Sequence, residues 1–179
     1  MKLSPVQQKF ILHWGEMGTR WGINRTVAQI HALLFISPKS LPAEDIAETL
    51  AVARSNVSTS LKELQGWGIV KLVHVMGDKR DHFESMKDVW EMFSLIIEER
   101  KRREIDPTVQ VLREVMQDLE KSRDAEDLTR QRIGDLLGFL EGMLSLYGEF
   151  RRVPIAAIRH VGKLRGQIRK LLAAKKEDS

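Results

Sequence analysis

Residues 41–85 read LPAEDIAETLAVARSNVSTSLKELQGWGIVKLVHVMGDKRDHFES, and their pattern decides the fold. An amphipathic stretch over 42–50, with Pro in its first turn, is followed by a tight connection and a second helical stretch over 54–65. Residues 69–75 are rich in Val and Ile, and residues 81–85 form a return strand after a turn. A short helix, a tight turn, a longer helix and a β-hairpin in this order predict a winged helix-turn-helix.

The stretch 54–65 has two chemically different faces. With about 100° per residue, Val57, Leu61 and Leu64 fall on one side as a core stripe. Short polar and cationic residues occupy the remaining surface. Asn pairs bidentately with adenine, Arg with guanine, and Lys reaches a phosphate or a guanine, so this surface suits a DNA major groove. The candidate DNA-contacting residues of this helix are Arg54, Ser55, Asn56, Ser58, Thr59 and Lys62.

The tip of the hairpin supplies a second candidate contact. Lys79 and Arg80 lie in the turn and could follow the phosphate backbone or enter the minor groove. Asp78 and Asp81 flank them and would repel phosphate, so we expect a modest contribution that comes mainly from Arg80. The alternative interpretation is a solvated helix face on a winged helix that binds protein and has no specific affinity for DNA.

Composition narrows the functional classes. The chain has 179 residues, no Cys, a net charge of +4 and a pI of about 9.4. Without Cys there are no disulfides, thiolate zinc sites or thiol nucleophiles. The five His lack metal-ligand spacing, and no phosphate loop or nucleophile motif occurs, so we expect no metal, no cofactor and no enzyme activity. With no signal peptide and no membrane-length apolar run, we expect a cytoplasmic protein.

The rest of the chain is predicted to be helical, which makes the fold mainly α with a small β-wing. We expect a winged-helix domain over 1–86 and a helical dimerisation and possible effector region over 87–179. Outside the segment quoted above, the predicted helices cover 5–18, 25–36, 87–103, 106–121, 126–150 and 154–174. Asn24 is expected to cap the second of these, and Asp106-Pro107 the fourth.

Three glycines recur at a spacing of four within the predicted helix 126–150, at Gly134, Gly138 and Gly142. Each Gly costs about 1 kcal/mol of helix propensity relative to Ala, so this line suggests the close approach of another helix. Packing within one subunit and packing between subunits explain it equally well. The basic segment 151–176 could contact phosphate or anionic lipid, but a solvated helix face is the preferred interpretation.

Several segments together resemble one family of regulators. The winged-helix pattern resembles the MarR superfamily, and four segments resemble its GbsR branch: QGWGIV (65–70), GDKRDHFE (77–84), KDVWEMF (87–93) and ERKRREIDP (99–107). The resemblance implies a homodimeric transcriptional regulator, most simply a repressor, on a pseudo-palindromic operator. Its two recognition helices would enter successive major grooves about 34 Å apart. Ala53 departs from the capping Ser that such motifs often carry, so Ser55 is expected to cap instead.

The same resemblance implies a small effector such as choline or glycine betaine, bound between the winged helix and the helical region. A quaternary ammonium needs a cage of aromatic rings. Trp90 and Phe93 are the favoured candidates because they lie just beyond the wing, although aromatic residues at helical spacing usually belong to a core. The wider set of candidate aromatic residues is Trp14, Trp21, Trp67, Phe139, Tyr147 and Phe150.

Overall fold

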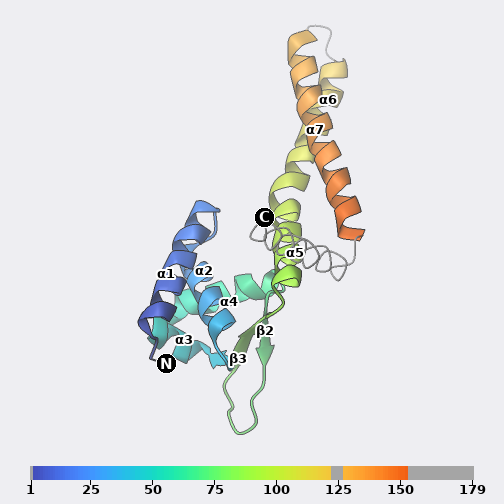
Figure 1. Ribbon diagram of the computed structural model, residues 1–179. Helices are drawn as coiled ribbons and strands as arrows, with labels where there is room; N and C mark the ends of the chain where they lie inside the picture. Colours follow the sequence, from blue (N-terminus) through green and yellow to red (C-terminus); the bar gives the residue numbers. More distant parts are fainter. Residues whose placement is uncertain (1, 122–126, 153–179) are drawn as a thin grey trace, which may run out of the picture. The chain divides into compact units, whose positions relative to one another are not determined.

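The computed structural model describes residues 2–121 and 127–152, which form two units (Figure 1). The first unit ends at Glu99 and the second begins at Arg100. This boundary lies later in the chain than the expected one at 86/87, because Met92 of α5 (Val89–Arg100) belongs to the core of the first unit. No helix of the described residues is long and apolar enough to cross a membrane.

The first two helices begin and end close to the predicted positions. Helix α1 (Pro5–Arg20) is N-capped by Ser4, whose hydroxyl accepts a hydrogen bond from the backbone N–H of Gln7. Helix α2 (Arg25–Ile36) is N-capped by Asn24, as predicted, and the Asn24 side chain accepts a hydrogen bond from the backbone N–H of Thr26. Gly22 joins the two helices with a φ of 74°, in the left-handed region where Gly is favoured.

The helix-turn-helix consists of α3 (Ala43–Leu50) and α4 (Arg54–Gly66). Ala51 makes the tight turn between them with a φ of 53° and a ψ of 44°. Two local predictions were wrong. Pro42 does not lie in the first turn of α3 but in a short strand before it, and Ser55 lies inside α4, whose N-cap is Ala53 without a side-chain hydrogen bond.

The wing is part of a three-stranded antiparallel sheet. Its strands are β1 (Leu41–Pro42), β2 (Val70–Val73) and β3 (His82–Ser85), in the spatial order β1-β3-β2. Phe83 lies at the centre of the register, opposite Leu41 on one side and Leu72 on the other. The backbone of β1 therefore ties the start of the helix-turn-helix to the wing.

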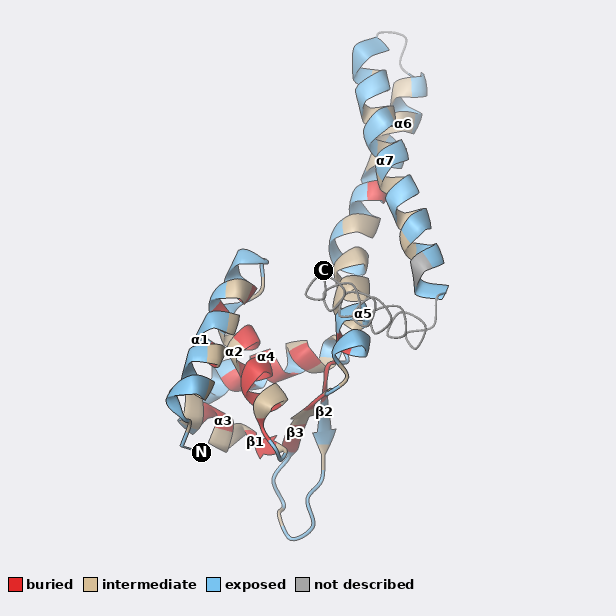
Figure 2. Cartoon of the chain, in the orientation of Figure 1, coloured by how far each residue is buried: buried red, intermediate tan, exposed pale blue. Residues whose placement is uncertain are grey.

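Helix α2 is the centre of the core, and Figure 2 shows it largely as buried residues. Ile30 and Leu33 are fully buried, and Val57, Leu61 and Leu64 of α4 pack into the same cluster. The predicted apolar stripe of α4 is thus confirmed. Because this stripe fixes the rotation of α4, it also determines which side chains of the helix face solvent.

The second unit contains α6 (Asp106–Lys121) and α7 (Asp127–Arg152), preceded by a π-helical segment η1 (Lys101–Ile105). Helix α6 has the predicted bounds, but the predicted cap at Asp106-Pro107 was wrong: Asp106 has helical φ and ψ values of −58° and −44°, and the chain stays helical through η1 into α6. Val109 is the only buried residue of the described part of this unit. The predicted helix 154–174, and with it most of the basic segment 151–176, lies outside the described residues.

Candidate nucleic-acid interface

The outer face of α4 carries the six residues that the sequence singled out. All six are exposed, whereas Val57, Leu61 and Leu64 on the opposite side are at most 2% exposed. Arg54 lies 4.0 Å from Glu44 of α3, and 76% of its side chain is accessible, so the guanidinium is open to a new partner. The face offers amide, hydroxyl and cationic groups without a bulky apolar side chain, which suits an approach to base edges.

In the wing, Lys79 is exposed but Arg80 is engaged. Its Nη2 lies 2.6 Å from Oδ2 of Asp78 and its Nε 3.0 Å from Oδ1, so the contact is bidentate. Nη1 lies 3.3 Å from Oδ1 of Asp45 on α3. The hydrogen bonds from Arg80 hold the pKa of Asp78 well below its usual range. Asp78 therefore binds the neighbouring cation, which modifies the expectation that it acts only to repel phosphate.

The interactions of Arg80 fix the wing against the helix-turn-helix. His82 adds to them, because its Nε2 lies 3.1 Å from Oδ2 of Asp78. A cleft between α4 and the wing brings Ser58 and Lys62 together with Arg80. Three of the candidate residues, two from α4 and one from the wing, thus line the same cleft.

Sequence reasoning missed Asp45 and a second polar cleft. In that cleft Asn56 and Thr59 of α4 lie beside Asn24 and Thr26 at the start of α2. The only sequence signal for it was Asn24 as an N-cap, which says nothing about its proximity to α4. Asp45 likewise gave no signal, because an acid in the first turn of a helix is usually explained by the helix dipole.

The two favoured cage residues lie on the surface of α5. Trp90 is 46% exposed and Phe93 55% exposed. Neither lines the apolar pocket that α1, α2 and the end of α4 enclose. Three of the other candidate aromatics, Trp14, Trp21 and Trp67, do line it.

Among the described residues, the glycine line of α7 meets little of its own chain. A Cβ placed on Gly138 or Gly142 meets no atom within 4 Å, and one on Gly134 makes an ordinary contact of 3.7 Å with Cε of Met116. Within the described residues, no helix of the same subunit therefore packs closely against these three glycines. A group of His, Asp and Glu side chains that could hold a metal ion is also lacking in this part of the chain.

Comparison with known proteins agrees with this geometry. A family model described as MarR family matches residues 21–81, which cover α2 to the wing. The HTH-type transcriptional repressor GbsR of Bacillus subtilis (strain 168) is 26% identical over 108 residues, which are 60% of this chain and 59% of that protein. The match thus spans about three fifths of the curated relative. A crystal structure of a transcriptional regulator covers 83% of this chain and 100% of its own, with a TM-score of 0.60 and 20% identity, and it shows the shared fold.

The fold and the exposed face of α4 define a winged helix-turn-helix protein. Over residues 21–81 the chain matches the model of the MarR family, so this segment is similar to the winged helix of that family. This family and the GbsR relative consist of transcriptional regulators and not of enzymes.

Proposed function

We propose that this chain is a homodimeric, sequence-specific DNA-binding protein that represses transcription. The observation that carries the proposal is the two-sided nature of α4. One side is anchored in the core by Val57, Leu61 and Leu64, and the other presents the amide, hydroxyl and cationic groups of the candidate interface to solvent. The role of repressor is taken from the name of the Bacillus relative.

In the proposed complex, α4 enters the major groove with its N-terminal end foremost. Asn56 pairs with a base edge, and Lys62, one turn and a half further along, contacts a phosphate or a guanine. Lys79 follows the backbone next to the groove. Arg80 contacts DNA only if a phosphate replaces Asp78 or Asp45 as its partner, because both carboxylates already bind its guanidinium.

Self-association is supported by the exposed apolar side chains of α7. Leu136, Phe139 and Leu146 are 48%, 67% and 67% exposed, and the open positions Gly138 and Gly142 lie between them along the helix. Several large apolar side chains exposed on one helix favour an interface. A second copy of the chain would cover it and would place two α4 helices on one operator.

An effector is the remaining part of the proposal. The resemblance of the sequence to the GbsR branch suggests choline or glycine betaine, and Trp90 and Phe93, three residues apart on α5, remain candidates for the aromatic surface that such a ligand needs. The effector would act by favouring one arrangement of the DNA-binding units over another.

The test is a titration of the purified protein against duplex DNA from upstream of its own gene, with a scrambled duplex as the control, at two salt concentrations. We expect tight binding that prefers the natural duplex and weakens steeply with salt. Equal affinity for both duplexes would contradict a specific site in that region, and the titration would then move to neighbouring promoters. Absence of binding even at low salt would contradict the proposal and favour a winged helix that binds protein.

A further inference from the structure

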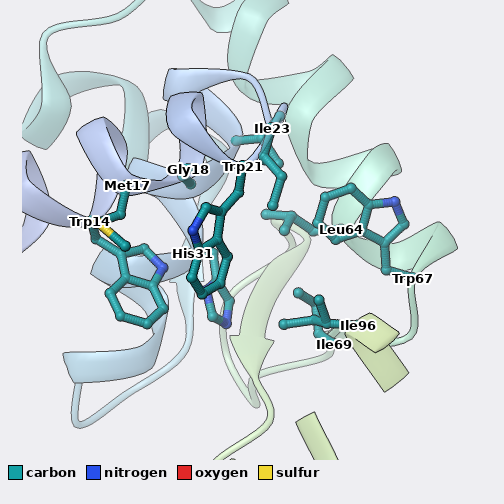
Figure 3. A pocket seen from close by; sticks show the side chains of 12 residues that line it. Trp14, Met17, Gly18, Trp21, Ile23, His31, Leu64, Trp67, Ile69 and Ile96 are labelled. Atoms are coloured by element: carbon teal, nitrogen blue, oxygen red, sulfur yellow. The ribbon is translucent and has the colours of Figure 1, made fainter. Parts of the chain in front are cut away.

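The loop at the tip of the wing carries an apolar side chain in full contact with solvent. Met76 lies between β2 and β3 and is fully exposed, and Val75 next to it is 40% exposed. The other methionines of the described first unit are placed differently. Met86 and Met92 pack against its core, and Met17 lines the apolar pocket between α1 and α2 (Figure 3). Met76 is therefore the methionine of this unit that is available to an external partner.

The backbone around Met76 forms a closed turn. The N–H of Asp78 donates to the carbonyl of Val75, with N and O 3.1 Å apart. Gly77 has a φ of 84°, as the third residue of a type II turn requires. Met76 is the second residue of this turn and stands at its corner. A hydrogen-bonded turn therefore presents the thioether.

The base of the turn is fixed to the rest of the first unit. Asp78 accepts hydrogen bonds from the Arg80 side chain and also from its backbone N–H, the latter at 3.0 Å. The His82 ring and Asp45 of α3 extend this network, as described above. Binding through Met76 thus costs little conformational entropy, because the turn that carries it is already ordered.

The position of the wing beside α4 favours DNA as the partner. Leu72 and Arg80 of the wing line one cleft together with Ser58 and Lys62 of α4. When α4 occupies a major groove, the strand on the far side of this cleft lies next to the sugar-phosphate backbone. The adjacent minor groove is then the part of the duplex that a hairpin tip reaches.

The charges around Met76 are compatible with this location. Lys79 and His74 are both exposed and take part in no ion pair within the described residues, so their nitrogens can donate to phosphate or sugar oxygens. The carboxylate of Asp78 is paired with Arg80 and repels phosphate less than a free one does. Polar donors thus lie close to Met76 in the wing loop.

We propose that Met76 acts as a wedge, which enters the minor groove next to α4 and inserts between two base pairs. This inference rests on the proposed function and adds a residue that determines specificity. Proteins that bind the minor groove use apolar side chains, Met among them, to unstack a base step. Unstacking costs least at flexible pyrimidine–purine steps such as TA and CA. Met76 therefore selects operators that have such a step under the wing, although it forms no hydrogen bond with a base.

The test first locates the unstacked step. The natural chain selects duplexes from a random pool, and 2-aminopurine is then placed at successive positions beside the segment that α4 protects. We expect its fluorescence to rise on binding at one step, because the probe brightens when it loses its stacking neighbour. Met76→Ala should abolish this rise, and Met76→Leu, which keeps a large apolar side chain, should retain it.

The second part of the test measures affinity by fluorescence anisotropy. The flexible step found with the probe is replaced by AA, which is stiff. The natural chain should bind the flexible duplex about tenfold more tightly than the stiff one, and for Met76→Ala this ratio should fall to about one. Val6→Ala is the matched control, because it shortens another exposed apolar side chain, on α1, and should leave the ratio unchanged.

The possible outcomes separate this inference from the proposed function. No fluorescence rise at any step, or a Met76→Ala variant that keeps the rise and the affinity ratio, overturns the wedge while specific DNA binding stands. Failure of the natural chain to bind any duplex overturns both. Sedimentation velocity covers the remaining alternative: a Met76→Ala variant that dissociates while its affinity ratio stays unchanged would assign the tip to a contact with a second copy, and would also overturn the wedge.

Discussion

The Arg80 guanidinium is held by the Asp78 carboxylate two residues earlier, with Nη2 and Oδ2 2.6 Å apart and Nε 3.0 Å from Oδ1. Asp45 of α3 binds the same guanidinium from the helix-turn-helix at 3.3 Å. The cation that would be the natural choice for a wing contact with DNA is thus already paired, and the pairing fixes the wing to α3.

Asp78→Asn should release Arg80 for phosphate. We expect tighter binding to non-specific DNA and a salt dependence steeper by about one phosphate contact, measured by fluorescence anisotropy over a salt series. The matched control is Asp81→Asn, which changes the net charge of the wing equally at a residue with no ion pair in the described structure. If both variants strengthen binding by the same amount, net charge and not the release of Arg80 is the cause.

Asn56→Ala and Lys62→Ala should affect DNA binding in different ways. Asn56→Ala should lose about 1–3 kcal/mol of discrimination between the natural and scrambled duplexes, because it removes a base contact. Lys62→Ala should weaken binding to both duplexes and reduce the salt slope by about one. Lys9→Ala on α1 is the control, and it should change neither quantity. If both α4 variants bind like the natural chain, α4 does not face the DNA.

Phe139→Glu should dissociate the proposed dimer. The side chain is 67% exposed on its own chain, so the change leaves the fold of the subunit intact and places a charge in the surface that a second copy would cover. Sedimentation velocity would show a monomer for this variant and a dimer for the natural chain. Gln117→Glu adds the same charge to an exposed position of α6 and should remain dimeric. A dimeric Phe139→Glu would place the interface elsewhere.

Lys87→Met should destabilise the first unit by about 1–2 kcal/mol. The ammonium donates to the carbonyls of Leu34 and Phe35 at 2.8 Å and to that of Ser37 at 3.1 Å, and these belong to the last turn and C-cap of α2. Urea unfolding followed by circular dichroism measures the effect. Lys71→Met is the comparison, because its ion pair with Glu84 is exposed and 3.8 Å long, and it should cost under about 0.5 kcal/mol. If both variants lost the same free energy of unfolding, the three hydrogen bonds to the carbonyls would not stabilise the unit more than an exposed ion pair does.

His31 should make the folded state sensitive to mild acid. Burial, together with a smaller contribution from the Lys87 ammonium, lowers the pKa of the native imidazole from 6.5 to about 4, so between these values the unfolded chain binds a proton that the native one does not. Stability should therefore fall as the pH is lowered from about 6.5 to about 4, by at most about 1.4 kcal/mol per unit, and this contribution should flatten below pH 4. The measurement is urea unfolding at a series of pH values. His31→Gln should lack this part of the slope, and identical slopes would contradict the assignment.

The helix-turn-helix was predictable because its signals are local and repeated. The stripe of Val57, Leu61 and Leu64 fixes the rotation of α4, and that rotation exposes Asn56 and Lys62. Local signals failed where a neighbouring strand or helix overrides them. Pro42 fits a first helical turn equally well, but pairing with His82 of β3 holds it in a strand.

The pocket and the Arg80 contacts could not be predicted, because they join residues far apart in the chain. Trp14, Trp21 and Trp67 converge only after α1 and α2 pack against the end of α4. The sequence pattern could show that Trp90 and Phe93 are neighbours on one helix. It could not show whether that helix face lines a pocket, because this depends on how the helices pack against each other. The same holds for Asp45, which meets Arg80 across 35 residues.

Lys87 also closes a long stretch of the chain on itself. It lies between β3 and α5, and its ammonium binds the carbonyls at the end of α2. The stretch between Ser37 and Lys87, which contains the helix-turn-helix and the wing, therefore begins and ends at one contact, although its ends are 50 residues apart in the sequence.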